Sequence, residues 1–343
     1  MHHVPWGRAA RLRHAVRWKT ARGRVLVPDA FRPWARDAAR TAGRLRPDVL
    51  VTFGQPMSDH LAGLALKRRT GIPWVAHFSD PWVDNPFREG SAPVVALNRR
   101  LEAKVLRGAD RLVFTSEETV DLVMRRYPSA IGRKAAVVPH AFPAAGYGDV
   151  ATPTGRVVVR HLGAFYGQRS PAPLLRALNL LARRDPAALD DVHVELWGPF
   201  ETPLEALEEH GRLPQGLLAA RGRTSYAHSL ELMRGADLLV VIDAPAEHSV
   251  FLPSKLVDYL GSRRPIVALT PPGASARIVE DAGGWVAPPE DAEAAADALA
   301  AALSAAREHR NRDWGNEELI RRYEPGVVAR QMDDVIRMTM LGA

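Results

Sequence analysis

Short apolar runs alternate with longer amphipathic segments after about residue 48, and this alternation most constrains the fold. A strand that is followed by a helix and then by a parallel strand is the repeating unit of α/β proteins, so the pattern predicts parallel sheets covered by helices. In the first half, the expected strands are 48–53, 74–78, 111–115 and 136–139, and the expected helices are 58–70, 93–108 and 117–127. In the second half, the expected strands are 157–162, 192–197, 217–220, 238–242 and 265–269, and the expected helices are 171–184, 202–210, 226–235, 254–262, 274–282 and 290–308.

A run that is rich in proline and glycine interrupts the alternation over 140–155. We interpret it as the connection between two domains, which suits a chain of 343 residues at about 150 residues per domain. The expected organisation is a first domain over 1–145, a linker over 146–155, a second domain over 156–325 and a C-terminal helix over 326–343. Open α/β sheets bind ligands beyond the carboxyl ends of their strands, so two such domains facing each other predict a cleft.

The composition excludes several kinds of chemistry. The chain has no cysteine, which excludes disulfides, thiolate metal sites and cysteine nucleophiles. Its histidines are scattered, and neither a P-loop nor an H-E-x-x-H motif occurs. No apolar run approaches the roughly 18 residues that a membrane-spanning helix needs. The sequence therefore predicts a cytoplasmic protein. It predicts neither a bound metal nor a cofactor.

The net charge of +7 belongs to the N-terminal stretch. Residues 1–46 contain 12 Lys or Arg and 2 Asp, a balance of +10, so the remaining residues balance at −3. This stretch is either a solvated helix face or a patch that attracts anionic lipid headgroups on the inner face of a membrane. Nucleic-acid binding is the least favoured interpretation, because no recognition motif or interleaved aromatic residues accompany the charges.

The sharpest local motif lies at the start of the expected helix 254–262. Pro253 is a helix-start signal, Ser254 is able to cap, and the first-turn amides of such a helix form an anion site. A cation such as Lys255 in the first turn is unfavourable beside the positive end of the helix dipole, unless it helps to hold a phosphate. Asp258 is one turn further on, where a carboxylate can accept hydrogen bonds from ribose hydroxyls. The plain structural alternative is an i,i+3 ion pair between Lys255 and Asp258.

A second motif follows the expected strand 157–162. Gly163 and Gly167 permit a close approach of the backbone to a diphosphate, and Arg169 can bind a phosphate bidentately. The alternative is a surface loop with a solvent-facing arginine.

These segments together resemble GT-B glycosyltransferases of the family 4 (group 1) kind from about residue 28 onward. The donor domain of that family opens with a glycine and a basic residue six positions later, matched here by Gly163 and Arg169. Its P-x-K-x-x-E/D-Y helix is matched from Pro253 to Tyr259 and is followed by a P-I/V-V strand at 265–267. The segment 283–289, G-G-W-V-A-P-P, and the P-W-V-A-H-F-S-D-P-W segment over 73–82 also fit.

The resemblance implies two Rossmann-like, doubly wound domains that face a cleft, with a C-terminal helix crossing back to the first domain. It places Gly163, Arg169, Ser254 and Lys255 on the diphosphate of a nucleotide-sugar donor. Asp258 would hold the ribose and Arg223 would lie near the nucleobase. On the acceptor side, His77 and Asp80 are the candidate catalytic residues, although an ordinary half-buried strand residue explains His77 equally well.

The chain departs from the family pattern in three places. Val250 replaces the first of two paired acids, so a carboxylate contact to the sugar is missing there. Ser79 occupies a place where a cationic or polar group is common. The first strand and glycine-rich loop of the family are not recognisable before residue 48, so the first domain is expected to be truncated at its start, through a misassigned first Met or through true loss.

The expected function is transfer of a sugar, with retention, from a nucleotide-sugar donor to a hydroxyl acceptor. The acceptor would be a cell-envelope glycan, a lipid-linked intermediate or a small molecule. Two alternatives stay open, namely a catalytically inactive GT-B-like nucleotide-binding or partner protein and a nucleotide-sugar 2-epimerase.

Overall fold

The computed structural model describes residues 27–85, 90–148, 155–310 and 312–342. The basic stretch before residue 27 and the linker positions 149–154, both singled out above, lie outside these ranges. The described residues form two compact units: one ends at Pro139 and also includes the segment from Ala329 onward, and the other is His140–Val328. No described helix has the length and apolar character required to cross a membrane.

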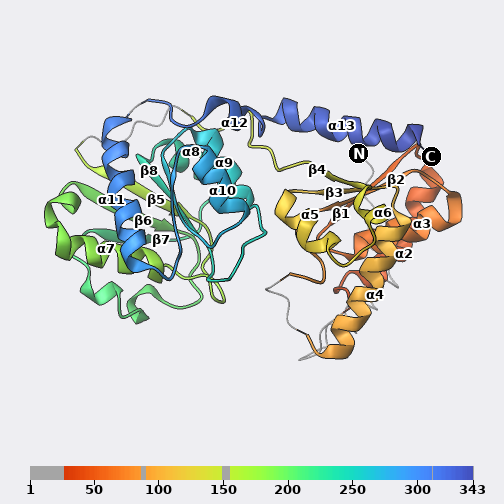
Figure 1. The fold of residues 1–343 in the computed structure, drawn as a ribbon, viewed down its shortest axis with the longest axis horizontal. Coiled ribbons are helices and arrows are strands. Elements are labelled where there is room, and N and C mark those ends of the chain that lie inside the picture. The colour runs from red at the N-terminus through yellow and green to blue at the C-terminus, as the bar shows by residue number, and fades with distance from the viewer. Residues whose placement is uncertain (1–26, 86–89, 149–154, 311, 343) are drawn as a thin grey trace. The chain divides into compact units, whose positions relative to one another are not determined.

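The first unit contains a four-stranded parallel sheet in the order β1-β2-β3-β4 (Figure 1). Its strands are β1 (Leu50–Gly54), β2 (Trp74–Phe78), β3 (Arg111–Phe114) and β4 (Ala135–Val137). Its helices are α2 (Arg32–Leu45), α3 (Ser58–Thr70), α4 (Ala92–Gly108), α5 (Glu117–Met124) and α6 (Ser129–Gly132). These bounds confirm the expected strands and the helices at α3, α4 and α5.

Helix α2 lies in the basic stretch 1–46, for which a solvated helix face was one interpretation, but its buried face was not expected because its sequence is dominated by arginine and alanine. Its Ala35, Ala38 and Ala39 are buried at helical spacing and pack with Ala62 and Leu66 of α3. Small side chains allow the two helices to approach closely, whereas the arginines occupy the other face. The apolar stripe is therefore real, but it is made of the least hydrophobic of the apolar residues.

The second unit contains a six-stranded parallel sheet in the order β10-β9-β8-β5-β6-β7. Its strands are β5 (Val157–Leu162), β6 (Val192–Trp197), β7 (Leu218–Arg221), β8 (Leu238–Ile242), β9 (Ile266–Leu269) and β10 (Trp285–Ala287). Its helices are α7 (Ala172–Arg184), α8 (Tyr226–Arg234), α9 (Ser254–Ser262), α10 (Ala274–Asp281), α11 (Ala292–Glu308) and α12 (Glu317–Arg321). Only β10 and α12 were not expected. The C-terminal helix α13 (Pro325–Leu341) confirms the expected last helix.

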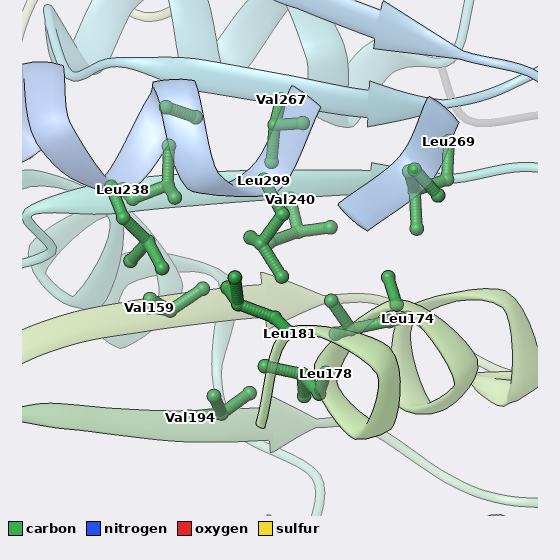
Figure 2. Close-up of a cluster of buried hydrophobic side chains, with 14 of the residues drawn as sticks. Val159, Leu174, Leu178, Leu181, Val194, Leu238, Val240, Val267, Leu269 and Leu299 are labelled. Atoms are coloured by element: carbon green, nitrogen blue, oxygen red, sulfur yellow. The ribbon is translucent and has the colours of Figure 1, made fainter. Parts of the chain in front are cut away.

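Both faces of this sheet are buried. Helices α7 and α11 cover one face through a cluster that includes Leu178, Val194, Val240 and Leu299 (Figure 2). Alternate strand residues such as Leu239 point into a second cluster with residues of α8, α9, α10 and α12. The sheet is thus doubly wound, as the alternation predicted.

The expected helix over 202–210 is wrong. The structure has two short 3₁₀ turns there, Leu204–Ala206 and His210–Arg212. Pro203 and Gly211 bracket the segment, and only Leu204 is buried in the first turn. A helix this short is marginal in water without an apolar face to pack, so the segment does not form one.

Candidate functional site

The sheet of the second unit changes its winding direction between β5 and β8. From β5 the chain proceeds outward through β6 and β7, and it then returns to the other side of β5 and proceeds through β8, β9 and β10. Ligands of open α/β sheets bind at such a switch point, beyond the carboxyl ends of the strands. Gly163 directly follows β5 and Asp243 directly follows β8, so both lie at this place.

Two loops meet at the switch point with their backbones nearly in contact. The amide of Gly163 donates to the carbonyl oxygen of Trp197 at 2.8 Å. A Cβ atom on Gly198 would lie 2.1 Å from the carbonyl oxygen of Gly163, and the φ of Gly198 is 139°. A Cβ atom on Gly163 would lie 2.4 Å from Nζ of Lys255. Glycine at both positions therefore allows the two loops and the start of α9 to approach one another.

Helix α9 begins at this approach, with Pro253 at its N-cap and Ser254 as its first residue. No side chain caps the helix, so the expectation that Ser254 could cap it is wrong. Pro253 occupies the cap because its φ of −62° and ψ of 130° lead into the first turn. The amide of Leu256 donates to the carbonyl oxygen of Pro253 at 2.9 Å, whereas the amides of Ser254 and Lys255 have no partner within the helix and are available to an anion.

Lys255 places a buried cation beside this helix start. Its Nζ atom is buried and has no hydrogen-bond partner among the described residues. The pKa of Lys255 is lowered to about 8, chiefly by burial and also by the positive charge of Arg169, while Asp243 opposes the shift. Buried cations without a partner are rare in proteins, so this one indicates that an anion belongs here.

Arg169 supplies a second, partly buried cation next to Lys255. Its Nη2 donates to Oδ1 of Asp243 at 3.1 Å, and its guanidinium carbon lies 5.5 Å from the centre of the Tyr166 ring. Its Nε atom is buried and has no partner within the described part of the chain. Two cations and one carboxylate leave this corner with a net positive charge, as a diphosphate site requires.

His161, on β5, lies close to the two cations. Its Nδ1 is 2.9 Å from the carbonyl oxygen of Val240 and acts as the donor, which leaves Nε2 as an acceptor without a described partner. Burial holds the pKa of His161 well below its usual value, with Lys255 and Arg169 as further causes against a small opposing effect of the Val240 hydrogen bond. The imidazole is therefore neutral and adds no charge to the corner.

A pocket of about 400 Å³ opens from this corner within the second unit. It is lined by residues that come after β5, β6 and β7 and from the first turns of α8 and α9, including Leu162, Gly163, Ala164, Trp197, Gly198, Pro199, Arg223, Thr224, Ser225, Tyr226, Ser254, Lys255 and Asp258. The structure thus brings together five of the sequence-predicted donor residues. Arg169 lies beside the pocket and is not part of its wall.

Asp258 lines the same pocket, one turn of α9 beyond Lys255. Its Oδ1 accepts a hydrogen bond from the Tyr226 hydroxyl at 3.0 Å, and its main-chain oxygen accepts one from the Tyr147 hydroxyl at 2.9 Å. Burial raises the pKa of Asp258 to about 6, against the effect of the Tyr226 hydrogen bond. Asp258 does not pair with Lys255, so the ion-pair alternative is not what the structure shows.

His77 and Asp80 belong to the first unit. His77 is buried on β2, and its ring centre lies 4.9 Å from that of Phe53. Asp80 accepts a hydrogen bond from Nε2 of Gln55 at 3.2 Å. The donor-side pocket includes neither residue, and their acceptor-side role stays a prediction.

Several residues of this site were missed from the sequence. Asp243 could have been found, because it directly follows a strand whose carboxyl end faces the site. Tyr226 and Trp197 have no motif and are recognised only through the pocket that they line. The described residues contain no cluster of three or more side chains able to hold a metal ion.

The family comparison concerns the first unit. A model of the glycosyl transferase 4-like domain matches residues 2–141. The D-inositol 3-phosphate glycosyltransferase of Saccharomonospora viridis is 26% identical over 254 residues, which are 69% of this chain and 58% of that protein. The chain thus spans less than two thirds of that relative's length.

Solved structures with a similar fold cover most of this chain. The structure of Anabaena HepE in complex with UDP is 15% identical, covers 89% of this chain and 82% of HepE, and has a TM-score of 0.66. A sucrose-phosphate synthase from Thermosynechococcus elongatus is 15% identical, covers 92% of this chain and 79% of that chain, and has a TM-score of 0.67. These likenesses confirm the GT-B fold that the sequence predicted.

Proposed function

We propose that the protein is a glycosyltransferase that moves a sugar from a nucleoside diphosphate donor to a hydroxyl acceptor, with retention at the anomeric carbon. The observation that carries the proposal is the buried, unpartnered ammonium of Lys255 at the start of α9, beside Arg169 and the close approach of Gly163. These groups stabilise the charge that develops when the bond between the sugar and the diphosphate breaks. The fixed donors need no reorganisation during that step.

The comparisons support a nucleotide donor. HepE has been solved with UDP and with UDP-glucose, and the Saccharomonospora viridis relative is named a glycosyltransferase. We therefore propose a uridine nucleotide as the first donor to test. Asp258 would accept hydrogen bonds from the ribose hydroxyls, for which the Tyr226 hydroxyl would give up its present bond. Arg223, after β7, would lie near the nucleobase.

We place His77 and Asp80 on the acceptor side as candidate catalytic residues. The acceptor would be a cell-envelope glycan, a lipid-linked intermediate or a small molecule.

The basic stretch over 1–24 supports a location on the inner face of a membrane, through attraction to anionic lipids. We expect the full chain to sediment with vesicles that contain phosphatidylserine at low salt and to be released at high salt, because salt screens that attraction. Equal recovery with uncharged vesicles would contradict this placement.

Thermal unfolding with UDP, GDP, ADP and UDP-glucose tests the donor site. A ligand at 100 times its dissociation constant is expected to add about 2.7 kcal/mol to the free energy of unfolding. Uridine is the matched control, because it lacks the diphosphate that Lys255 and Arg169 would bind. Failure of every nucleotide to stabilise a folded sample would contradict the proposal.

A second candidate is a nucleotide-binding protein that does not transfer sugar. Val250, in the place of an acid of the related enzymes, favours it. Such a protein would be stabilised by the nucleotide and would release no sugar from the donor with any acceptor. Release of UDP from UDP-glucose that depends on an added acceptor would support the transferase instead.

A further inference from the structure

The indole of Trp197 is held rigidly at the wall of the pocket. Its Nε1 donates to Oε2 of Glu195, two residues earlier on the same face of β6, at 3.2 Å. Its main-chain oxygen accepts from the amide of Gly163, which fixes the backbone as well. The ring is half-buried and lines the pocket together with Arg223 and Thr224, which follow β7.

Glu195 is itself fixed by two arginines. Nε of Arg160 donates to its Oε2 at 2.7 Å, and Nη2 of Arg221 donates to its Oε1 at 3.1 Å. Arg160 is buried and also donates from Nη1 to the carbonyl oxygen of Leu232 at 2.8 Å. A carboxylate with donors on both oxygens has little freedom to rotate, so the indole that it binds keeps one orientation.

Such an arrangement is more than the fold needs. An indole that only filled space would not require a buried carboxylate held by two guanidinium groups, and burying these charges costs free energy. A flat aromatic surface of fixed orientation that lines the same pocket as Gly163 and Lys255 fits a flat aromatic ligand group. A nucleobase stacks on an aromatic side chain without regard to its hydrogen-bonding edge.

We propose that Trp197 is the surface on which the nucleobase of the donor stacks, and that Glu195 is a positioning residue that orients the indole through its Nε1–H. The inference rests on the proposed function, since it assigns the base end of the same nucleoside diphosphate site. Tyr226 is the competing aromatic residue of this pocket, but its hydroxyl is engaged by Asp258, at the ribose end.

Binding of UDP and of pyrophosphate to the full-length protein, measured by calorimetry, tests the assignment. Pyrophosphate keeps the charge and lacks the base. Trp197→Leu is expected to weaken UDP binding by about 5- to 150-fold and to leave pyrophosphate binding unchanged, because one base stacked on an aromatic ring contributes about 1–3 kcal/mol. Trp197→Phe keeps a ring and is expected to bind UDP within a few-fold of the wild type.

A spectroscopic measurement separates stacking from a merely structural role. UDP is expected to quench tryptophan fluorescence in the wild type but not in Trp197→Phe, although both bind it. Glu195→Gln is expected to reduce the affinity for UDP more than that for pyrophosphate, because the indole loses its fixed orientation.

Three results would overturn the inference. The first is unchanged UDP affinity in Trp197→Leu, and the second is an equal loss of UDP and pyrophosphate binding, which would mean that the indole only supports the pocket. The third is a loss of UDP binding without a loss of pyrophosphate binding in Tyr226→Leu, and no such loss in Trp197→Leu. That result would assign the base to Tyr226. Failure of the wild type to bind UDP, GDP or ADP would instead overturn the proposed function together with this inference.

Discussion

Lys255→Met is expected to unfold at a higher temperature than the wild-type protein when no ligand is present. The pKa of this lysine falls from 10.5 to about 8, chiefly because burial disfavours the charged form. At pH 7 the ammonium is therefore charged in both states, and its burial costs the folded state about 3 kcal/mol, at about 1.4 kcal/mol per pKa unit. Methionine fills a similar volume without a charge and removes that cost.

The pH dependence of unfolding identifies the cause. Between about pH 8 and pH 10.5 the unfolded chain keeps the Lys255 proton and the folded protein loses it. The unfolded state then binds more protons, so this group makes the wild type more stable as the pH rises through that window. The gain in the free energy of unfolding of Lys255→Met over the wild type is expected to be largest at pH 7 and to disappear near pH 10.5. Urea unfolding at a series of pH values measures it.

The same variant is expected to lose the stabilisation by nucleoside diphosphates. A hydrogen bond to a charged group contributes about 1.5–3 kcal/mol, so affinity should fall by about 10- to 150-fold. Lys104→Met is the matched control, since Lys104 is exposed on α4 and such surface changes stay within about 0.5 kcal/mol. A destabilised Lys255→Met variant, or one that binds UDP normally, would contradict the assignment of Lys255 to an anion.

Local patterns in the sequence identified the candidate donor residues but could not bring them together in space. Gly163 and Lys255 were each recognised from a local pattern, a glycine after a strand and a cation in a first helical turn. Their contact depends on β5 and β8 being neighbours in the sheet, although β6 and β7 come between them in the chain. Local periodicity carries no information on that order, so the pocket required the structure.

The residues that the sequence missed interact with parts of the chain that are distant in the sequence. Arg169 and Asp243 are 74 positions apart and pair only because of the same sheet order. Tyr226 and Asp258 are 32 positions apart and come from the first turn of α8 and from α9. Trp197 was read as the end of a buried strand, and nothing in its neighbourhood in the sequence indicates that its ring lines a pocket. Chemistry that depends on one helix turn was predictable, whereas chemistry that depends on pairs of elements was not.

Asp243→Asn is expected to destabilise the ligand-free protein by about 3–5 kcal/mol, because it removes the only carboxylate that pairs with Arg169 among the described residues. Asp243 is 4% exposed, and its side-chain oxygens accept hydrogen bonds from Arg169 and from the hydroxyl of Thr270. Without its charge, Arg169 and Lys255 repel each other in a site with little water. Such a loss is a large part of the roughly 5–15 kcal/mol that keeps a domain folded.

The ligand response of Asp243→Asn should change in the opposite direction. A diphosphate that enters the variant meets two cations and no carboxylate, so it should bind more tightly and restore more stability than it adds to the wild type. Thr270→Val is the matched control, because it removes one hydrogen bond to the Asp243 carboxylate, costs about 1.5–3 kcal/mol and keeps the charge. Thermal unfolding of both variants with and without UDP makes the measurement. A smaller response in Asp243→Asn would mean that Asp243 serves to hold Arg169 in its binding position, and that its charge is not what limits affinity for the anion.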